Sequence, residues 1–325
     1  MKLSRRQSLH LTVGATALSL IPRFGNAQAY PTRQVRIVVG FPPGGQIDVV
    51  ARLIGHSLAE RLGQPFVIEN RPGAGGNIGT EAAVRAPADG YTLLLVGVSN
   101  AINATLYDKA NFVFLRDIAP VAAIERSYLV MLVNPSVPSK TVSAFIAYAE
   151  ANPGKINMAS AGIGAPSHMA IELLKVMTGV KVIHVPYRGD SLAITDLLGG
   201  QVQFYFGSVA GSIEHIRAGR LRGLAVTGAM RSELLPDMPT VAEFVPGFEV
   251  VSWYGVGAPK NTPIEIIRRL NNEINTALAS PVMQARLADH GGVALGGSPI
   301  EFGKFMADET EKWAKVIRAA NIKVE

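Results

Sequence analysis

Apolar residues follow two spacings along the chain, one typical of strands and one typical of helices. Short β-branched or apolar runs at Val35–Val39, Phe66–Ile68 and Thr92–Val96 predict strands. After Asp48, apolar residues recur every three or four positions until Gly63, which predicts a helix that ends there. Strand, loop and helix in this order favour βαβ units and an α/β fold with largely parallel pairing.

The same alternation continues to the end of the chain. Strands are predicted over 129–133, 156–160, 182–185, 202–206, 221–226 and 250–256, and helices over 139–151, 167–178, 191–198, 213–218 and 299–319. About nine strands are too many for one compact sheet, so we expect two lobes with the second inserted into the first. Lobe 1 is predicted as residues 30–125 plus 228–325 and lobe 2 as residues 126–227, with linkers near 124–126 and 227–231.

The N-terminus has the pattern of an export signal. Basic residues come first, an apolar stretch follows from Leu9 to Ile21, and Ala27-Gln28-Ala29 ends the segment. The stretch is shorter than the roughly 20 residues that span a bilayer, although a short anchor is the alternative. Ser4 to Leu9 resembles a twin-arginine signal, except that Ser8 stands at the usual Phe, so the export pathway stays open. We expect residues 1–29 to be a signal peptide, cleaved near Ala29, and the mature protein to reside in the periplasm.

Composition narrows the possible functions. The 325 residues are 48% hydrophobic and 17% charged, which is ample for a folded core. The absence of cysteine excludes disulfides, thiolate metal sites and a cysteine nucleophile. Four of the six net positive charges lie in residues 1–29, which contain no acid, so the remainder carries +2. This near-neutral charge argues against a nucleic-acid-binding surface.

The first candidate site is the loop from Gly40 to Asp48, between a predicted strand and a helix start. Glycines let a backbone approach a ligand closely, and the unpaired N–H groups of a helix N-terminus favour an anion. A connecting turn with Asp48 as a plain helix cap explains the same residues, and physics alone does not decide between the two. The candidate ligand-binding residues here are Phe41, Pro43, Gly44, Gly45, Gln46 and Asp48.

A second glycine-rich loop, Ser160 to His168, has the same placement in the middle lobe. Open α/β sheets bind ligands at the carboxyl ends of their strands, so two such loops could grip one small anion across a cleft. For His168, the alternative is a polar first-turn residue that faces solvent. The candidates in this loop are Ser160, Gly162, Gly164 and His168.

Further candidates follow other strands. Tyr187 could close on the hydrocarbon part of a ligand and Arg188 could pair with a second carboxylate, although a solvated loop explains both. Gly207 and Ser208 come directly after the aromatic run 204–206. Asn100 is the remaining candidate for reading the ligand.

Signatures of catalysis and of cofactors are missing. The run Gly73 to Gly79 lacks the third glycine of a dinucleotide fingerprint, and Ile156 stands where a phosphate-binding loop needs Ser or Thr. The six histidines show no metal-ligand spacing. We therefore expect no catalytic residues, no metal and no cofactor.

Several motifs together resemble the Bug (TctC-like) solute receptors of tripartite tricarboxylate transporters. They occur in the family's order across nearly all of the mature chain, and the Ser160–His168 loop is among them. The matching segments are Phe41-Pro42-Pro43-Gly44-Gly45 with Asp48, Glu69-Asn70-Arg71-Pro72-Gly73-Ala74-Gly75-Gly76, Asp89-Gly90-Tyr91-Thr92-Leu93, Asn152-Pro153-Gly154-Lys155, Val185-Pro186-Tyr187-Arg188-Gly189, Asp196-Leu197-Leu198-Gly199-Gly200-Gln201-Val202 and Pro239-Thr240-Val241-Ala242-Glu243.

The resemblance implies a two-lobe, periplasmic-binding-protein-like clamshell in which each lobe is a mostly parallel sheet flanked by helices. It implies that backbone groups of Pro43–Asp48 and Ser160–His168, with ordered waters, hold a carboxylated metabolite that is passed to a membrane permease. Three departures bear on the ligand: Gln46-Ile47 before Asp48, Ala165 at a frequent hydroxyl position, and Tyr205 where the family often carries an acid.

We therefore predict a monomeric receptor that captures a small carboxylate without chemistry and delivers it to the permease subunits of a tripartite tricarboxylate-type transporter. Asn100, Tyr187 and Ser208 would read the rest of the ligand. One alternative is a periplasmic hydrolase or lyase that uses His168 or His184 with a nearby Asp. Another is a sensory receptor that signals to a membrane kinase. The sequence does not name the carboxylate.

Overall fold

The computed structural model describes residues 30–107 and 109–323, and its helices and strands belong to one unit that begins at Arg33. The predicted signal peptide lies outside the described residues. Three parallel strands open the unit, in the order β2 (Phe66–Asn70), β1 (Val35–Val39) and β3 (Thr92–Gly97). Strand β9 (Val251–Pro259) then pairs antiparallel with β3.

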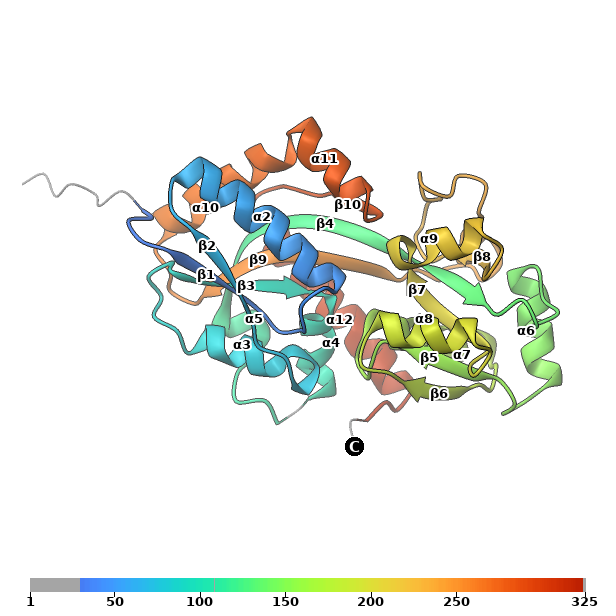
Figure 1. The fold of residues 1–325 in the computed structure, drawn as a ribbon. Coiled ribbons are helices and arrows are strands. Elements are labelled where there is room, and N and C mark those ends of the chain that lie inside the picture. Colours follow the sequence, from blue (N-terminus) through green and yellow to red (C-terminus); the bar gives the residue numbers. More distant parts are fainter. Residues whose placement is uncertain (1–29, 108, 324–325) are drawn as a thin grey trace, which may run out of the picture. The chain divides into compact units, whose positions relative to one another are not determined.

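Strand β4 (Ile118–Val133) is the element that joins the sheet together (Figure 1). Its first part, 118–128, pairs antiparallel with β9 and β10 (Gly292–Ala294). Its last part, 129–133, pairs antiparallel with β7 (Phe204–Ser208) and β8 (Arg222–Val226). Here β1–β3, β9, β10 and residues 118–128 are called the first half-sheet. Residues 129–133 with β5–β8 are the second half-sheet.

The second half-sheet repeats the order of the first. Strand β5 (Asn157–Ser160) pairs in parallel with β6 (Ile183–Pro186) and with β7. Each half-sheet thus holds three neighbouring parallel strands, as the βαβ pattern predicts, whereas the pairings of β4 and β9 are antiparallel. Each half-sheet is therefore mixed. In the first, β9 pairs antiparallel with β3, and in the second, β4 pairs antiparallel with β7 and β8.

Helices cover both faces of the sheet (Figure 1). In the first half-sheet, α2, α10 and α11 lie on one face and α3, α4 and α12 on the other. The helices are α2 (Gln46–Leu62), α3 (Asn77–Val84), α4 (Val98–Leu106), α5 (Phe114–Asp117), α6 (Val142–Ala151), α7 (Pro166–Thr178), α8 (Asp190–Leu198), α9 (Val209–Arg217), α10 (Ile264–Leu278), α11 (Pro281–Ala288) and α12 (Pro299–Ala319), with 3-10 turns at Ala74–Gly76 and Val241–Glu243. Helix α2 ends where the sequence predicts, because Gly63 adopts the left-handed conformation (φ 70°) that closes it.

One continuous core connects the two half-sheets. Buried side chains from β1 and β3 belong to the same cluster as Met131, Phe204 and Phe206 of the second half-sheet. Helix α12 packs against β4, α4 and α7 and adds Trp313 to that core. The indole N–H groups of Trp253 and Trp313 both donate to the buried Glu309 carboxylate, which ties α12 to the sheet.

The change of pairing partners along β4 locates the crossing between the half-sheets. Tyr128 still pairs with Val251 of β9, whereas Leu129 pairs with Ser208 of β7. After β8 the chain stays beside it, since the Val226 amide donates to the Pro239 carbonyl. The division into two lobes with bending linkers near 124–126 and 227–231 stays a prediction.

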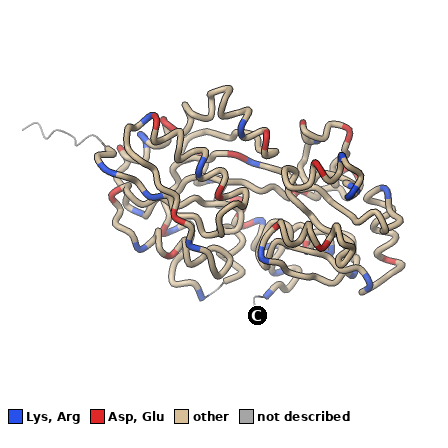
Figure 2. The backbone as a smooth tube through the Cα atoms, viewed as in Figure 1, with Lys and Arg blue, Asp and Glu red and all other residues tan. Residues whose placement is uncertain are grey.

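Acidic and basic residues are interspersed over the traced chain (Figure 2). Among residues 30–107 and 109–323, no helix combines the length and the apolar character that a bilayer crossing requires.

Candidate ligand-binding site

The loop between β1 and α2 presents unused backbone donors. Gly44 has φ +87°, which favours glycine, and an added Cβ at Gly44 or Gly45 would meet nothing within 4 Å. The amides of Gly45, Gln46 and Ile47 donate no hydrogen bond within the described part of the chain. Gly45 caps the 17-residue helix α2 and Gln46 and Ile47 are its first residues, so these three N–H groups lie at the positive end of the helix dipole.

Asp48 holds this loop in shape. Its side chain is 2% exposed and accepts hydrogen bonds from Arg52 (2.9 and 3.0 Å), from Asn70 (2.8 Å) and from the Gly44 amide (3.0 Å). Burial alone would raise the pKa of Asp48, but the hydrogen bonds from Arg52, Gly44 and Asn70 together lower it below its ordinary value. Asn70 also donates to the Phe41 carbonyl. Asp48 thus acts on the loop's conformation, and its carboxylate has no free donor to offer an anion.

The other candidates of this loop lie around that opening. The Phe41 ring packs against Gly76, where an added Cβ would lie 3.0 Å from the ring. Pro43 is exposed. The Gln46 side chain leaves the loop and donates to Glu125 (3.1 Å) and to Ser127 (3.0 Å) on β4, next to the point where β4 changes partners.

The second glycine-rich loop, between β5 and α7, uses most of its donors internally. The amide of Ala161 donates to the Ser167 hydroxyl (2.9 Å) and that of Gly162 to the Ser160 hydroxyl (3.2 Å). The Gly164 amide donates to His168 Nδ1 (3.2 Å). Gly162 (φ +136°) and Gly164 (φ +77°) both require glycine conformations. The loop has the predicted position, but the amides of its glycines, Gly162 and Gly164, already donate to side chains of the loop, and the unused amides are those of Ile163, Ser167 and His168.

The buried His168 and the half-buried His184 form a stacked pair. Their ring centroids lie 4.1 Å apart, and the Ser160 hydroxyl lies 2.6 Å from His184 Nε2. Burial lowers the pKa of each imidazole to about 4, so both are neutral at pH 7. His168 is 4% exposed and turned toward its own loop. No Asp forms a hydrogen bond or ion pair with either ring in the described part of the chain, so the arrangement proposed for a hydrolase or lyase does not form.

Two other candidate residues, Asn100 and Tyr187, have side chains that are hydrogen-bonded within the protein. The Asn100 side chain accepts from the Gly97 amide (2.9 Å) and donates to Thr80 (2.8 Å). The Tyr187 hydroxyl donates to Asp196 (2.7 Å), and burial first, with this bond, raises the pKa of Tyr187 to about 12.

Gly207 lies inside β7, where an added Cβ would come within 2.8 Å of Leu132 and Ser212. Ser208 begins α9 and accepts from the Gly211 amide (3.2 Å). Ser208 therefore lies at a helix start, unlike the other candidates that the second half-sheet carries outside its glycine-rich loop.

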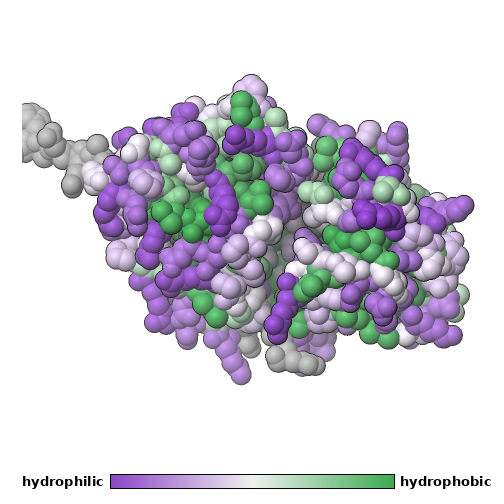
Figure 3. Space-filling view, in the orientation of Figure 1, coloured by the Kyte–Doolittle hydropathy of each residue, from purple (hydrophilic) through white to green (hydrophobic). Residues whose placement is uncertain are grey.

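The two half-sheets approach each other on both sides of these loops. An added Cβ at Gly164 would lie 3.0 Å from Leu106 and 3.2 Å from Asn103 Oδ1 of α4. An added Cβ at Gly291, just before β10, would lie 3.1 Å from Val209 of α9. Between the surfaces over α2 and over α8, the space-filling view shows a hollow (Figure 3). The start of α2 lies beside this hollow (Figure 1).

Sequence reasoning missed a buried acid in the second half-sheet. Asp190, the first residue of α8, accepts a hydrogen bond from the Tyr205 hydroxyl and interacts with Ser208. Burial raises the pKa of Asp190, and burial with the Asp190 charge raises the pKa of Tyr205. Tyr205 was noted as a departure from the family pattern, but nothing in the sequence placed it against Asp190.

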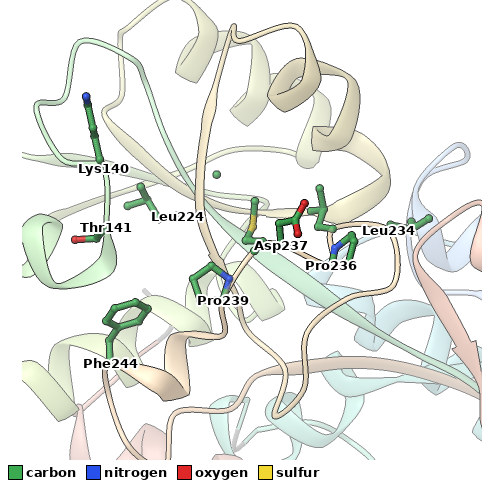
Figure 4. Close-up of a pocket in the computed structure, with 11 residues that line it drawn as sticks. Lys140, Thr141, Leu224, Leu234, Pro236, Asp237, Pro239 and Phe244 are labelled. Carbon is green, nitrogen blue, oxygen red and sulfur yellow. The ribbon is translucent and has the colours of Figure 1, made fainter.

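A separate cavity of about 500 Å³ lies away from both loops (Figure 4). Lys140, Asp237, Pro239 and Phe244 are among the residues that line it, and none of the predicted ligand-binding residues does. Among the described residues, no cluster of three or more His, Asp or Glu side chains could hold a metal ion.

The chain matches the family model described as "Tripartite tricarboxylate transporter family receptor" over residues 50–322. It is 39% identical to the protein BugT of Bordetella pertussis over 303 residues, which covers 92% of this chain and 93% of BugT. It is also 39% identical to a UPF0065 protein from the tcbD-tcbE intergenic region of Pseudomonas sp. strain P51, over 89% of this chain and 87% of that protein.

Solved structures agree with these matches. The R. palustris protein Rpa4515, solved with adipate, has a TM-score of 0.85 and 38% identity over 90% of this chain and 99% of its own. The periplasmic binding protein BugD has a TM-score of 0.83 and 32% identity over 91% of this chain and 100% of its own. MatC from Rhodopseudomonas palustris, solved with malate, has a TM-score of 0.81 and 31% identity over 89% of this chain and 100% of its own.

These likenesses extend over both half-sheets and confirm the predicted periplasmic-binding-protein-like α/β fold. They also favour solute binding over the enzyme alternative, because the family and its solved members are receptors. The protein belongs to the tripartite tricarboxylate transporter receptor family and is a solute-binding receptor of the Bug type.

Proposed function

We propose that this receptor captures a small carboxylate by binding one carboxylate group to the backbone amides of Gly45, Gln46 and Ile47. The observation that carries the proposal is the set of three unused donors at the start of α2, beside open space at Gly44 and Gly45. A carboxylate in that position accepts charge-assisted hydrogen bonds and gains from the helix dipole.

The ligand class is supported by two relatives. Adipate is bound in the R. palustris protein Rpa4515 and malate in MatC, and both are dicarboxylates. For this chain, we extend the class to small carboxylates of similar size. The ligand lies between the first loop and the start of α8 and α9, and the half-sheets close over it by bending near 124–126 and 227–231. Closure requires that the ligand contact both sides, because only differential affinity shifts such an equilibrium.

The proposal includes the receptor's place in transport. The protein is exported to the periplasm, loses residues 1–29 and delivers its ligand as a monomer to the membrane permease of a tripartite tricarboxylate-type transporter. Acidic and basic residues alternate along the traced backbone, which gives no support for a nucleic-acid partner (Figure 2). Osmotic-shock fractionation with N-terminal sequencing tests this part: a periplasmic protein that starts at Tyr30 is expected, and a cytoplasmic protein with residues 1–29 intact would contradict it.

Isothermal titration calorimetry with C4 to C6 mono- and dicarboxylates, including adipate and malate, tests the binding function. We expect saturable 1:1 binding by at least one acid, together with a smaller radius of gyration in small-angle scattering. Gly45→Ala, which adds a methyl group in the open space, should weaken that binding. The absence of binding by every carboxylate in the panel would contradict the proposal.

A further inference from the structure

One side chain of α2, that of Gln46, forms hydrogen bonds with β4 in the described part of the chain. Gln46 is the first residue of α2, and its Nε2 donates to Glu125 Oε1 (3.1 Å) and to the Ser127 hydroxyl (3.0 Å). The other side-chain bonds of α2 go to residues of its own helix, of β2 and of α10. Gln46 therefore connects the helix start to a strand that lies 79 and 81 positions further along the chain.

The two acceptors lie on one face of β4 at a particular part of that strand. Glu125 and Ser127 are two positions apart, so their side chains point the same way, and both are buried. Directly before them the register with β9 shifts between Ala123 and Glu125, an irregularity of the kind that re-aims side chains. Directly after them β4 exchanges β9 for β7, between Tyr128 and Leu129. The acceptors thus occupy the stretch of β4 at which the first half-sheet passes into the second.

Glu125 depends on Gln46 for its hydrogen bonding. Its Oε1 accepts from Gln46, whereas its Oε2 has no hydrogen-bond partner within residues 30–107 and 109–323. An added Cβ at Gly292 of β10 would collide with this Oε2, so the carboxyl group is confined between Gln46 and Gly292. Burial raises the pKa of Glu125 to about 8, against the effect of the Gln46 hydrogen bond, so the group is mostly protonated at pH 7. The contact therefore joins neutral groups and needs no charge on Glu125.

The residue that makes this contact also carries one of the amides assigned to the ligand. The backbone N–H of Gln46 lies between those of Gly45 and Ile47 at the helix start. A carboxylate that draws this amide toward itself also moves the side chain, and hydrogen bonds weaken steeply when they are misaligned. The helix start and β4 therefore move together, or the bonds to Glu125 and Ser127 are lost.

We propose that the Gln46 side chain is a positioning group that transmits carboxylate binding from the start of α2 to β4, where the half-sheets meet. The inference rests on the proposed function, because it takes the ligand to be bound at the amides of Gly45 to Ile47. The Gln46 amide holds the ligand, and its side chain passes the resulting shift to Glu125 and Ser127. The competing explanation, in which Gln46 only provides a buried acid with a donor, predicts no such transmission.

Amide NMR at pH 7, during titration with adipate, malate, succinate and glutarate in turn, tests the inference. With the acid that binds most tightly, we expect wild-type shifts at Gly45 and Ile47 and also over residues 127–129. Gln46→Met keeps the length of the side chain but removes the donor. At ligand saturation, its shifts over residues 127–129 should fall at least threefold while those at Gly45 and Ile47 persist. Calorimetry should show at least fivefold weaker binding.

Two outcomes would overturn the inference while leaving the proposed function in place. One is the absence of shifts over residues 127–129 in the wild type, and the other is shifts of wild-type size there in Gln46→Met. The absence of shifts at Gly45 and Ile47 in the wild type, with every acid, would instead count against the proposed function. If thermal denaturation shows that Gln46→Met does not fold, Ser127→Ala, which removes one of the two acceptors, replaces it. The shifts at Tyr128 and Leu129 should then fall at least twofold, and unchanged shifts would overturn the inference.

A conservative variant and a matched control separate transmission from a general loss of contacts. Glu125→Gln keeps a neutral carbonyl acceptor for Gln46, so it should retain the shifts over residues 127–129, and their loss would contradict the neutral contact. Arg61→Met is the control, because Arg61, near the other end of α2, donates to Glu273 of α10 (2.7 Å). It should change neither binding nor the shifts of β4. A loss in Arg61→Met as large as that in Gln46→Met would overturn the specific role of Gln46.

Discussion

The two glycine-rich loops occupy equivalent positions after parallel strands, yet they differ in what they present. Around Gly44 and Gly45 there is open space, and the next amides along the helix start are unused. In the loop from Ser160 to His168, side chains of the loop itself accept the amide hydrogens. A glycine-rich sequence before a helix is therefore not enough to make an anion site: what matters is whether nearby side chains have already taken the donors.

The two acids near these loops, Asp48 and Asp190, also differ in the groups that bind their carboxylates. Asp48, beside the first loop, accepts from Arg52 and Asn70 and also from the Gly44 amide of the loop. Asp190, in the second half-sheet, has hydroxyl partners, and no Lys, Arg or His among residues 30–107 and 109–323 forms an ion pair with it. The first acid therefore fixes a loop whose neighbouring amides are unused, whereas the second is held by hydroxyl groups.

Removal of the Asp48 carboxylate should have the largest effect on both the unfolding free energy and carboxylate binding. Asp48→Ala leaves the Gly44 amide, Arg52 and Asn70 without their acceptor, so we expect a loss of about 2–4 kcal/mol in unfolding free energy and at least tenfold weaker carboxylate binding. Urea denaturation and calorimetry measure the two effects.

Asp308→Ala is the control for that experiment, since Asp308 pairs with Lys304 at the same i, i+4 spacing on an exposed surface. Its cost should stay below about 1 kcal/mol, with binding unchanged. Equal costs for the two variants would show that Asp48 is an ordinary surface ion pair.

Acidification should act on the second loop through its histidine pair. Burial places the pKa of both His168 and His184 at about 4, below the 6.5 of a free imidazole. The unfolded chain therefore binds more protons between pH 6.5 and pH 4, so the pair's contribution to stability is complete above pH 6.5 and is lost as pH falls toward 4. Each pKa unit corresponds to about 1.4 kcal/mol.

Urea denaturation at a series of pH values measures this slope. His184→Gln should flatten it between pH 6.5 and 4, whereas His56→Gln, at an exposed position of α2, should not. Identical slopes in the wild type and in His184→Gln would contradict the account of the buried pair.

Gly207→Ala should destabilise the second half-sheet. Its methyl group would lie 2.8 Å from Leu132 and Ser212 and 2.9 Å from the Tyr205 ring, which is closer than real Cβ atoms come. We expect a loss of about 1–3 kcal/mol in unfolding free energy. A wild-type urea midpoint in this variant would show that the strand relaxes without cost.

Gly45→Ala, at the first loop, should weaken binding rather than stability. Its change in unfolding free energy should be the smallest among these variants. The backbone of Gly45 (φ −77°) suits alanine and the added methyl group meets nothing, so stability should change by less than about 0.5 kcal/mol. Binding of the preferred carboxylate should weaken by about tenfold, because the methyl group enters the space beside the amides. Unchanged affinity in calorimetry would place the carboxylate elsewhere.

Local sequence pattern was sufficient for most of the strands and long helices and for the positions of both loops, but not for α4, α5, α11 and β10. A β-branched run marks β1, an apolar run that ends at Val226 marks β8, and Gly63 ends α2 through its left-handed backbone. The pattern failed for the first part of β4, because Pro120 and the pair Glu125-Arg126 interrupt its apolar run. That part of β4 is a strand nonetheless, since pairing with β9 and β10 holds it on both sides.

The details of the candidate site could not be predicted, because they depend on contacts between distant elements. Asp190 and Tyr205 belong to a helix start and a strand, and only the fold brings them together. Likewise, Gln46 reaches Glu125 across 79 positions of sequence. The sequence supplies glycines and a helix start, but it does not tell which amides remain unused.

A titration followed by amide NMR tests the central claim most directly. On addition of the carboxylate that binds best in calorimetry, we expect the largest shifts at the amides of Gly45, Gln46 and Ile47, with smaller shifts at Gly162 and Gly164. The largest shifts at Lys140, Asp237 and other residues of the separate cavity in Figure 4, with Gly45 to Ile47 unmoved, would contradict the account.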